Sequence, residues 1–191
     1  FMPLNDYIDE HGHYINELLD AHPNTITEIT APDGNIYALP SHYRCFNCQL
    51  AQRFWINKTF VDALGINKMP ETTDEFYDYL KAVKTQDPNG NGENDEIPLV
   101  GATSGWFQSV EGFLMNSFIY NDSNRYTTID ENGTISFVAN QPEWKQGLEY
   151  LNKLCSEGLL DPVSFTQDEM GLRSLVEYEE AMLVGAVPSG G

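Results

Sequence analysis

The stretch DPNGNGENDEIP, residues 87–98, contains the residues whose types and spacing could bind a metal ion. Counted from its first aspartate, the loop carries oxygen-bearing side chains at positions 1, 3, 5, 7, 9 and 10. These residues are Asp87, Asn89, Asn91, Glu93, Asp95 and Glu96. Calcium takes about six to eight oxygen ligands, which a tight loop with alternating side chains can supply. Gly92 falls at the sixth position, where an EF-hand loop bends sharply.

The end of this loop departs from the EF-hand pattern, because Pro98 stands at position 12 in place of a bidentate glutamate. Glu96, at position 10, can replace that ligand if the chain folds back early. Three carboxylates, two amides and the backbone carbonyl of Glu93 then give six ligands, and the Glu93 side chain can point outward. The alternative is a solvated turn, because asparagine and glycine are ordinary turn residues. We predict a calcium ion with a structural role, since the pattern leaves no obvious open coordination position.

The elements on either side of this loop have the clearest signals in the chain. Residues 70–86 predict a helix in which Thr72 caps the first turn and Glu75 reaches back as its capping-box partner. One face of this helix is apolar at helical spacing: Phe76, Leu80 and Val83. Residues 97–103, IPLVGAT, form a continuous apolar run suited to a buried strand. The calcium loop would therefore close a junction between a helix and a strand.

Helices and strands alternate along the rest of the chain, which predicts an α/β fold. The predicted helices cover residues 4–23, 58–65, 105–118, 141–158 and 169–178. The predicted strands cover 53–57 and 181–187, and hairpins cover 26–39, with 26–30 as the first strand, and 126–138. The hairpins turn at Asp33-Gly34 and at Asn132-Gly133, the second as a two-residue turn. The helix over 141–158 presents one apolar face: Trp144, Leu148, Leu151 and Leu154.

The charge of the chain is strongly negative, because 29 acidic against 10 basic residues give a net charge of -19. Such a chain repels phosphate backbones and anionic lipids, which makes nucleic acid and membrane surfaces poor partners. No apolar run approaches the roughly 20 residues of a membrane-spanning helix. The hydrophobic share of 41% predicts a globular fold.

Cys45 and Cys48 have redox or zinc spacing, but only Cys155 and scattered histidines could complete a zinc site.

Several stretches of the sequence resemble one known family. Residues 54–65 and 69–99 carry most of the resemblance, and the loop DPNGNGENDEIP is its most specific element. Residues 29–40, 143–162 and 179–186 match further stretches in the expected order, so the resemblance covers most of the chain. The family is that of the family-1 extracellular solute-binding proteins of ABC importers, in particular the large lipoproteins that bind oligosaccharides or alginate.

The resemblance implies a two-lobed α/β protein with lobes of the periplasmic-binding-protein type II, which close around a ligand. It implies that residues 1–43 are the end of the first lobe and the approach to the hinge. Residues 44–191 would be the second lobe, truncated at its C-terminus, with the calcium loop 87–98. The calcium site of the relatives carries over to the six loop residues named above. The full-length protein would be extracellular, lipid-anchored to the bacterial cell membrane, and would deliver its solute to ABC permease subunits.

The loop TSGWFQS, residues 103–109, supplies the main candidates for ligand binding. It follows an apolar strand, and loops at the carboxyl ends of strands border the ligand crevice of an open α/β sheet. Trp106 could stack on a sugar ring, with Ser104 and Gln108 as partners of its hydroxyl groups. The alternative for Trp106 is a core aromatic. Ser189, after the last strand, and Tyr43, in the segment expected to cross between the lobes, are further candidates.

These residues predict a binding protein that captures an oligosaccharide or another small solute and is not an enzyme. The rival is a secreted, calcium-stabilised glycoside hydrolase fragment, since hydrolysis needs only two carboxylates at a fixed separation. The sequence lacks an acid set in an apolar surround at a strand end, which a raised pKa would require. A third reading, a calcium-dependent adhesion module, predicts no cleft.

Overall fold

The computed structural model describes residues 1–42, 45–46, 51–120, 126–178 and 182–190. The described residues fall into two compact units, Phe1–Phe46 and Asn47–Gly191. The assignment of these units to a first and a second lobe stays a prediction. Within the described ranges, no helix combines the length and the apolar character needed to cross a membrane.

The first unit begins with short helices: α1 (Asn5–His11), α2 (His13–Ala21) and α3 (Asn24–Ile29). The predicted helix over residues 4–23 is confirmed as helical structure but is interrupted at Gly12, where ψ is 43° and the chain leaves helical geometry. The backbone also packs closely at this point. A Cβ atom at Gly12 would lie 2.4 Å from the carbonyl oxygen of Ile8, so a larger residue would not fit the break.

The predicted hairpin over residues 26–39 forms only around its turn. Residues 26–29 are helical, and Thr30 pairs with Ile36 in an isolated bridge across Gly34, whose φ is 85°. The side chain of Asn5 holds the turn, since it accepts a hydrogen bond from the backbone N–H of Ile36 at 3.0 Å. The strand prediction failed because β-branched residues favour a strand only where a neighbouring strand packs against them.

The second unit is built on a sheet whose strand order in the described part of the chain is β1-β5-β2. The strands are β1 (Gln52–Ile56), β2 (Ile97–Leu99) and β5 (Val184–Gly190). The central strand, β5, runs antiparallel to β1 and parallel to β2. The last strand begins at Val184 and reaches Gly190, later than the predicted 181–187. The mixed sheet with its crossover helices confirms the α/β prediction.

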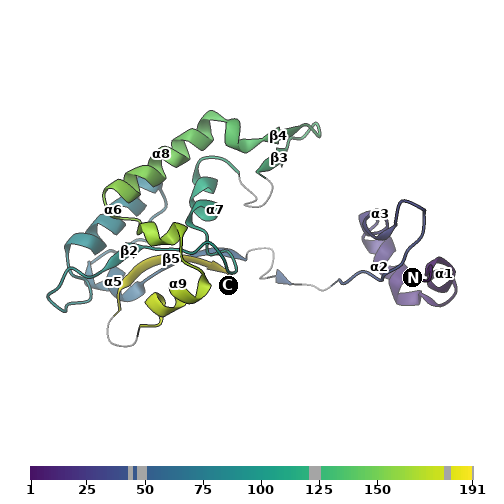
Figure 1. The fold of residues 1–191 in the computed structure, drawn as a ribbon, viewed down its shortest axis with the longest axis horizontal. Helices are drawn as coiled ribbons and strands as arrows, with labels where there is room; N and C mark the ends of the chain where they lie inside the picture. Colours follow the sequence, from purple (N-terminus) through teal and green to yellow (C-terminus); the bar gives the residue numbers. More distant parts are fainter. Residues whose placement is uncertain (43–44, 47–50, 121–125, 179–181, 191) are drawn as a thin grey trace. The chain divides into compact units, whose positions relative to one another are not determined.

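Two long helices, α6 (Thr73–Thr85) and α8 (Pro142–Ser156), form the main core with the sheet. Figure 1 shows both above the sheet, with α9 (Glu169–Val176) below it. The predicted capping box of α6 is present: Thr72 Oγ1 accepts from the N–H of Glu75 at 3.1 Å, and Glu75 accepts in return from the N–H of Thr72 at 3.2 Å. The hydroxyl of Tyr150 on α8 donates to the carbonyl of Thr73 at 2.8 Å, which joins the two helices.

The apolar face of α8 was predicted correctly except at one position. Leu151 and Leu154 are buried as expected, whereas Leu148 is 46% exposed. Gly147 takes the buried place instead, and a Cβ atom there would lie 2.6 Å from the sulfur of Met115. The helix therefore approaches η1 (Met115–Ser117) through its glycine, which turns Leu148 away from the core.

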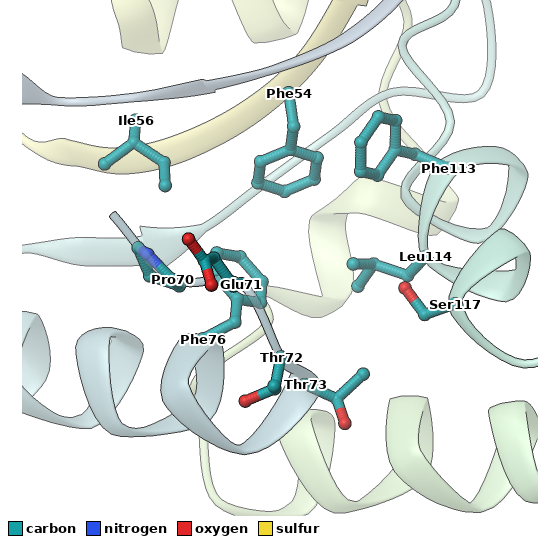
Figure 2. Close-up of a pocket in the computed structure, with 10 residues that line it drawn as sticks. All are labelled: Phe54, Ile56, Pro70, Glu71, Thr72, Thr73, Phe76, Phe113, Leu114 and Ser117. Atoms are coloured by element: carbon teal, nitrogen blue, oxygen red, sulfur yellow. The ribbon is translucent and has the colours of Figure 1, made fainter. Parts of the chain in front are cut away.

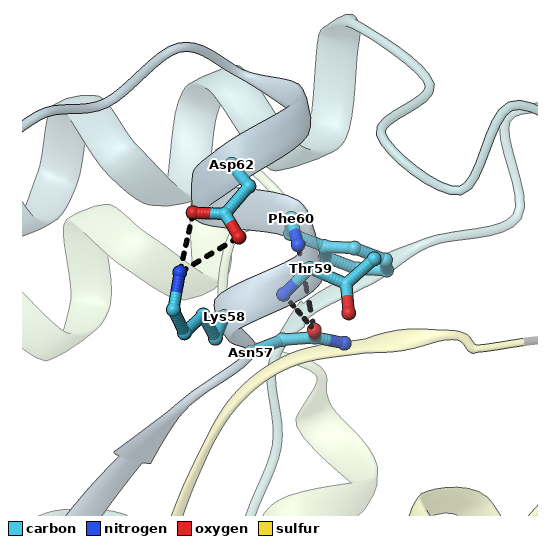
Figure 3. A network of polar contacts seen from close by, with 5 residues as sticks. All are labelled: Asn57, Lys58, Thr59, Phe60 and Asp62. Atoms are coloured by element: carbon cyan, nitrogen blue, oxygen red, sulfur yellow. Dashed lines mark hydrogen bonds and ion pairs between the residues drawn. The ribbon is translucent and has the colours of Figure 1, made fainter.

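The short helix α5 (Lys58–Ala63) is fixed to the sheet by the residue that caps it. Figure 3 shows the carbonyl oxygen of the Asn57 side chain accepting from the N–H groups of Thr59 and Phe60, at 3.0 and 3.4 Å. The amide group of the same side chain donates to the carbonyl of Val184 at 3.1 Å. Asn57 thus satisfies two helix donors and ties the helix to β5.

The remaining elements are shorter than the sequence predicts. The helix expected over 105–118 is reduced to α7 (Val110–Leu114), because φ is 95° at Gly105 and 55° at Phe107. The second hairpin, β3 (Thr127–Ile129) and β4 (Ile135–Phe137), has a longer turn than two residues. The carboxylate of Asp130 closes it by accepting from the N–H groups at 132 and 134. The other 3-10 helices are η2 (Val138–Asn140) and η3 (Pro162–Phe165).

Candidate functional site

The predicted ligand loop, residues 103–109, is anchored at its base and at its middle. The N–H of Ala102 donates to the carbonyl of Gln108 at 2.8 Å, which folds the loop back on the strand that precedes it. The N–H of Gly190 donates to the carbonyl of Trp106 at 2.7 Å, which joins the loop to the end of β5. The loop therefore lies at the carboxyl ends of β2 and β5, where open α/β sheets bind ligands.

This loop lines a cavity of about 310 Å³. Its described lining residues are Gln52, Ala102, Thr103, Ser104, Gly105, Trp106, Phe107, Gln108, Ser109 and Gly112. Three of the predicted ligand residues, Ser104, Trp106 and Gln108, thus face one space. Ser189 is outside this lining set, and Tyr43 lies outside the described residues. Whether these residues bind a ligand stays a prediction.

Trp106 has the position of a surface platform. Its side chain is 52% exposed, which does not fit the alternative of a core aromatic. Its ring neighbours the ring of Phe107, with 6.0 Å between the centroids. A half-exposed indole beside a cavity offers an apolar face to which the C–H groups of a sugar could bind.

The polar groups beside Trp106 differ in what they already bind. Ser104 Oγ accepts a hydrogen bond from the N–H of Glu169 at 3.1 Å, at the start of α9. Gln108 Oε1 is buried and has no hydrogen-bond partner among the described residues. An unpaired buried acceptor costs about 1–3 kcal/mol, so the Gln108 amide is the group of this cavity that most needs an added donor.

Gln52 is a lining residue that the sequence did not indicate. It stands at the start of β1 and is the register partner of Gly190, which brings it beside the loop. The sequence placed this residue in the expected crossing segment. Only the antiparallel pairing of residues 52–56 with the last strand could have located it at the cavity.

A larger cavity, of about 580 Å³, lies between β1, α6 and α7. Figure 2 shows its walls of Phe54, Phe76 and Phe113, with Glu71 and Thr72 among the polar groups. The three rings pack on one another, with 5.1 and 4.8 Å from the Phe54 centroid to those of Phe76 and Phe113. The smaller cavity differs in combining a half-exposed indole with the Gln108 amide oxygen, which has no partner among the described residues.

The loop 87–98 is organised around the carboxylate of Asp87. Its oxygens accept from the backbone N–H groups of Gly90, Asn91 and Gly92 at 2.9, 3.2 and 2.9 Å. The side-chain oxygen of Asn91 accepts in turn from the N–H of Glu93 at 2.7 Å. These bonds curl the backbone into the tight loop that the glycine spacing predicts.

The later acids of the loop close back on its beginning. Asp95 accepts from the amide groups of Asn89 and Asn91, each at 3.0 Å. Glu96 Oε1 accepts from the N–H of Asn89 at 3.3 Å, whereas Glu96 Oε2 is buried without a hydrogen-bond partner in the described residues. The chain thus folds back far enough for Glu96 to reach the backbone of Asn89. No group of three or more His, Cys, Asp or Glu side chains in the described residues is gathered closely enough to hold a metal.

The donor set of this loop nevertheless fits a calcium ion. Five side chains of the loop accept hydrogen bonds from other groups of the same loop through their oxygens: Asp87, Asn89, Asn91, Asp95 and Glu96. Both amide side chains donate to Asp95 through nitrogen, while their oxygens accept from the backbone N–H groups of Asn91 and Glu93. Glu96 Oε2 has no partner among the described residues and would suit either a cation or a hydrogen-bond donor, so the calcium ion stays a prediction.

The two cysteines within the described residues, Cys45 and Cys155, do not favour the zinc site that the cysteine spacing allows. Cys45 is disulfide-bonded, so its sulfur is not a free thiolate ligand. Cys155 is a free thiol, and burial raises its pKa. A raised pKa lowers the thiolate fraction at neutral pH, which makes Cys155 a poor nucleophile.

The chain belongs to the family of bacterial extracellular solute-binding proteins, which it matches over residues 2–190. The fructooligosaccharide ABC transporter substrate-binding protein FusA of Streptococcus pneumoniae serotype 4 is 32% identical over 172 residues, which are 87% of this chain and 32% of FusA. Lipoprotein LipO of Bacillus subtilis is 27% identical over 167 residues, which are 84% of this chain and 30% of LipO. These matches confirm the family that the sequence resembles.

A comparison with solved structures finds the same family. A structure described as a FusA EF-hand mutant in complex with fructo-nystose matches with a TM-score of 0.81 at 28% identity, covering 100% of this chain and 39% of that chain. The chain thus spans about a third of the length of the curated relatives it matches. The name of FusA describes a substrate-binding protein of an ABC transporter and no enzyme activity, in agreement with the expectation from the sequence.

Proposed function

We propose that this chain is part of the substrate-binding component of an ABC importer and takes an oligosaccharide in the cavity at residues 103–109. The observation that carries the proposal is the half-exposed indole of Trp106 beside the unpaired oxygen of Gln108. The family match supports this class of ligand, and so does the name of FusA, which specifies fructooligosaccharides as its substrate.

The groups around the cavity suit a sugar ring. The apolar C–H face of the ring would stack on Trp106, and rotation of the buried Gln108 amide toward the cavity would let a ring hydroxyl donate to its Oε1. Ser104 Oγ accepts from the backbone of α9, so its own hydrogen stays available to a sugar oxygen. Capture needs no chemical step, because the solute only shifts the protein toward the conformation that binds it better.

The proposal extends to the location and partners of the whole protein. The protein would be extracellular and lipid-anchored to the bacterial cell membrane, and ABC permease subunits would receive its solute. The description of the family as extracellular and the name of Lipoprotein LipO support this location.

Saturation-transfer NMR with fructo-nystose tests the binding proposal, because the method detects weak binding of a ligand in fast exchange. We expect saturation to reach the sugar, most strongly at the C–H protons of one ring face. A peptide of similar mass, as an alternative class of solute, should receive none. Absence of transfer to fructo-nystose and to other oligosaccharides at millimolar concentration would contradict the proposal.

We also propose a structural calcium ion in the loop 87–98, held by the side chains of Asp87, Asn89, Asn91, Asp95 and Glu96 and the carbonyl of Glu93. The unpaired Oε2 of Glu96 and the oxygen-rich donor set support it. The EF-hand in the description of the FusA structure supports it as well. The ion would hold the end of α6 close to the start of β2 and would take no part in ligand chemistry.

Thermal unfolding in calcium, magnesium and EDTA tests this site. Calcium at about 100 times its dissociation constant should stabilise the folded chain by about 2.7 kcal/mol. For a chain of this size the melting temperature should rise by roughly 5–10 °C. Glu96→Gln removes one charged ligand and should abolish most of that rise. Glu93→Gln is the matched control, because only its backbone carbonyl is proposed as a ligand. An equal response of both variants to calcium would contradict the assignment.

A further inference from the structure

Gly190, the last described residue of β5, lies against the indole of Trp106. A Cβ atom built on Gly190 would lie 2.3 Å from Cδ2, 2.4 Å from Cε3 and 2.8 Å from Cγ of that ring. These ring atoms are consecutive and almost equally distant from one point. The point therefore lies over the face of the indole and not beside its edge.

The glycine at this place is needed for space and not for backbone conformation. Gly190 is a strand residue, paired in register with Gln52, and its φ is outside the left-handed region that only glycine adopts freely. An alanine could therefore adopt the backbone of Gly190. Its methyl group would overlap the indole, because real Cβ atoms do not approach ring carbons to less than 3.0 Å.

The backbone of the same residue also fixes the loop that carries the ring. The N–H of Gly190 donates to the carbonyl of Trp106 at 2.7 Å. One face of the indole is thus covered by the glycine backbone, while 52% of the side chain remains exposed. The free face is the one that can meet a ligand, and its orientation is set by the end of β5.

We propose that Gly190 is the positioning residue of the Trp106 platform: by lacking a side chain it seats one indole face and turns the other toward the cavity. The contact between Gly190 and the Trp106 ring, called the seating below, is inferred from contacts within the chain. The effect of the seating on sugar binding rests on the proposed function, so the seating and the binding are measured in separate experiments.

Acrylamide quenching of Trp106 fluorescence tests the seating. The reporter is the chain with Trp55→Phe and Trp144→Phe, in which Trp106 is the remaining indole. Gly190→Ala should lift the ring and expose its second face, so the quenching constant rises and the near-UV circular dichroism of Trp106 changes. Ser189→Ala, one position earlier in the same strand, is the control and should leave both signals unchanged. Unchanged quenching in Gly190→Ala would overturn the inference.

A double-mutant cycle separates positioning from simple damage to the strand. Gly190→Ala should lower the melting temperature in the chain with Trp106 and should have little effect once Trp106→Ala has removed the ring. Equal losses in the two backgrounds would show that the methyl group harms the strand itself and would overturn the inference.

The affinity for fructo-nystose then tests the functional consequence. Gly190→Ala should weaken binding by about three- to tenfold, as expected for the loss of one aromatic contact. Unchanged affinity in both Gly190→Ala and Trp106→Ala, together with altered quenching, would contradict the proposed function and leave the seating intact. If only Trp106→Ala weakens binding and quenching is unaltered in Gly190→Ala, the inference about Gly190 is wrong and the proposed function still holds.

Discussion

Two oxygen atoms distinguish the candidate sites at the scale of single residues. Glu96 Oε2 and Gln108 Oε1 are buried, and neither has a hydrogen-bond partner among the described residues. Each such atom costs stability unless a ligand or water pairs with it. A cation suits the carboxylate and a hydroxyl donor suits the amide. The sequence indicated both residues by type and spacing, but their burial depends on elements distant in the chain.

Glu111 provides a residue-scale prediction of pH dependence. This acid lies in the first turn of α7, and burial raises its pKa. The pKa of this carboxyl is higher in the folded than in the unfolded chain, because burial disfavours its charged form only in the folded state. The fold therefore loses stability as the pH rises from the unfolded-state pKa through the folded-state pKa. Glu111→Gln should therefore raise the melting temperature at pH 7 and raise it less at pH 4, where the carboxyl is mostly protonated in both states.

The control for this prediction is Glu143→Gln, an exposed acid in the first turn of α8. It should show no comparable gain at neutral pH. Thermal unfolding of both variants across pH 4 to 7 provides the measurement. A larger gain for Glu111→Gln at low pH than at neutral pH would contradict the burial of its carboxyl.

At the scale of elements, local signals predicted structure well where they agreed with packing. The capping box and apolar face of α6 were correct, because both act within one helix. The strand expected over residues 26–30 was wrong, since residues 26–29 are helical and only Thr30 forms a bridge among the described residues, with Ile36. The contact of Gly190 with Trp106 could not be predicted, because it joins β5 to a loop far earlier in the sequence.

The capping box gives a prediction at this scale. Thr72→Ala removes the side-chain acceptor for the N–H of Glu75 and should destabilise the fold by about 1 kcal/mol. The melting temperature should fall by roughly 2–4 °C. Thr85→Ala, at the other end of α6, is the control, because its hydroxyl bonds only back to the carbonyl of Lys81 in the same helix. A smaller loss in Thr72→Ala than in Thr85→Ala would contradict the capping role.

At the scale of the whole molecule, composition and family decide between classes of protein. The net charge of -19 argues against nucleic acid as a partner, and the match over residues 2–190 places the chain among solute-binding proteins. The sugar cannot be derived from the chain, because one platform and two or three polar groups fit many pyranose and furanose rings.

A binding protein should leave its ligand unchanged. We expect incubation with fructo-nystose to release no new reducing sugar over hours, at protein concentrations that saturate the ligand. A glycoside hydrolase would produce reducing ends under the same conditions, with turnover that depends on a carboxyl pair. Catalytic release of sugar by the purified chain would favour the rival class.

The affinity of the chain for fructo-nystose, compared between Trp106→Ala and Trp55→Ala, tests most directly whether the loop 103–109 binds the solute. The two tryptophans are exposed to a similar extent, at 52% and 49%, but only Trp106 lines the cavity of that loop. We expect Trp106→Ala to weaken binding by about tenfold, while Trp55→Ala stays close to the parent chain. Equal affinities of the two variants, or a greater loss in Trp55→Ala, would contradict the assignment of the site.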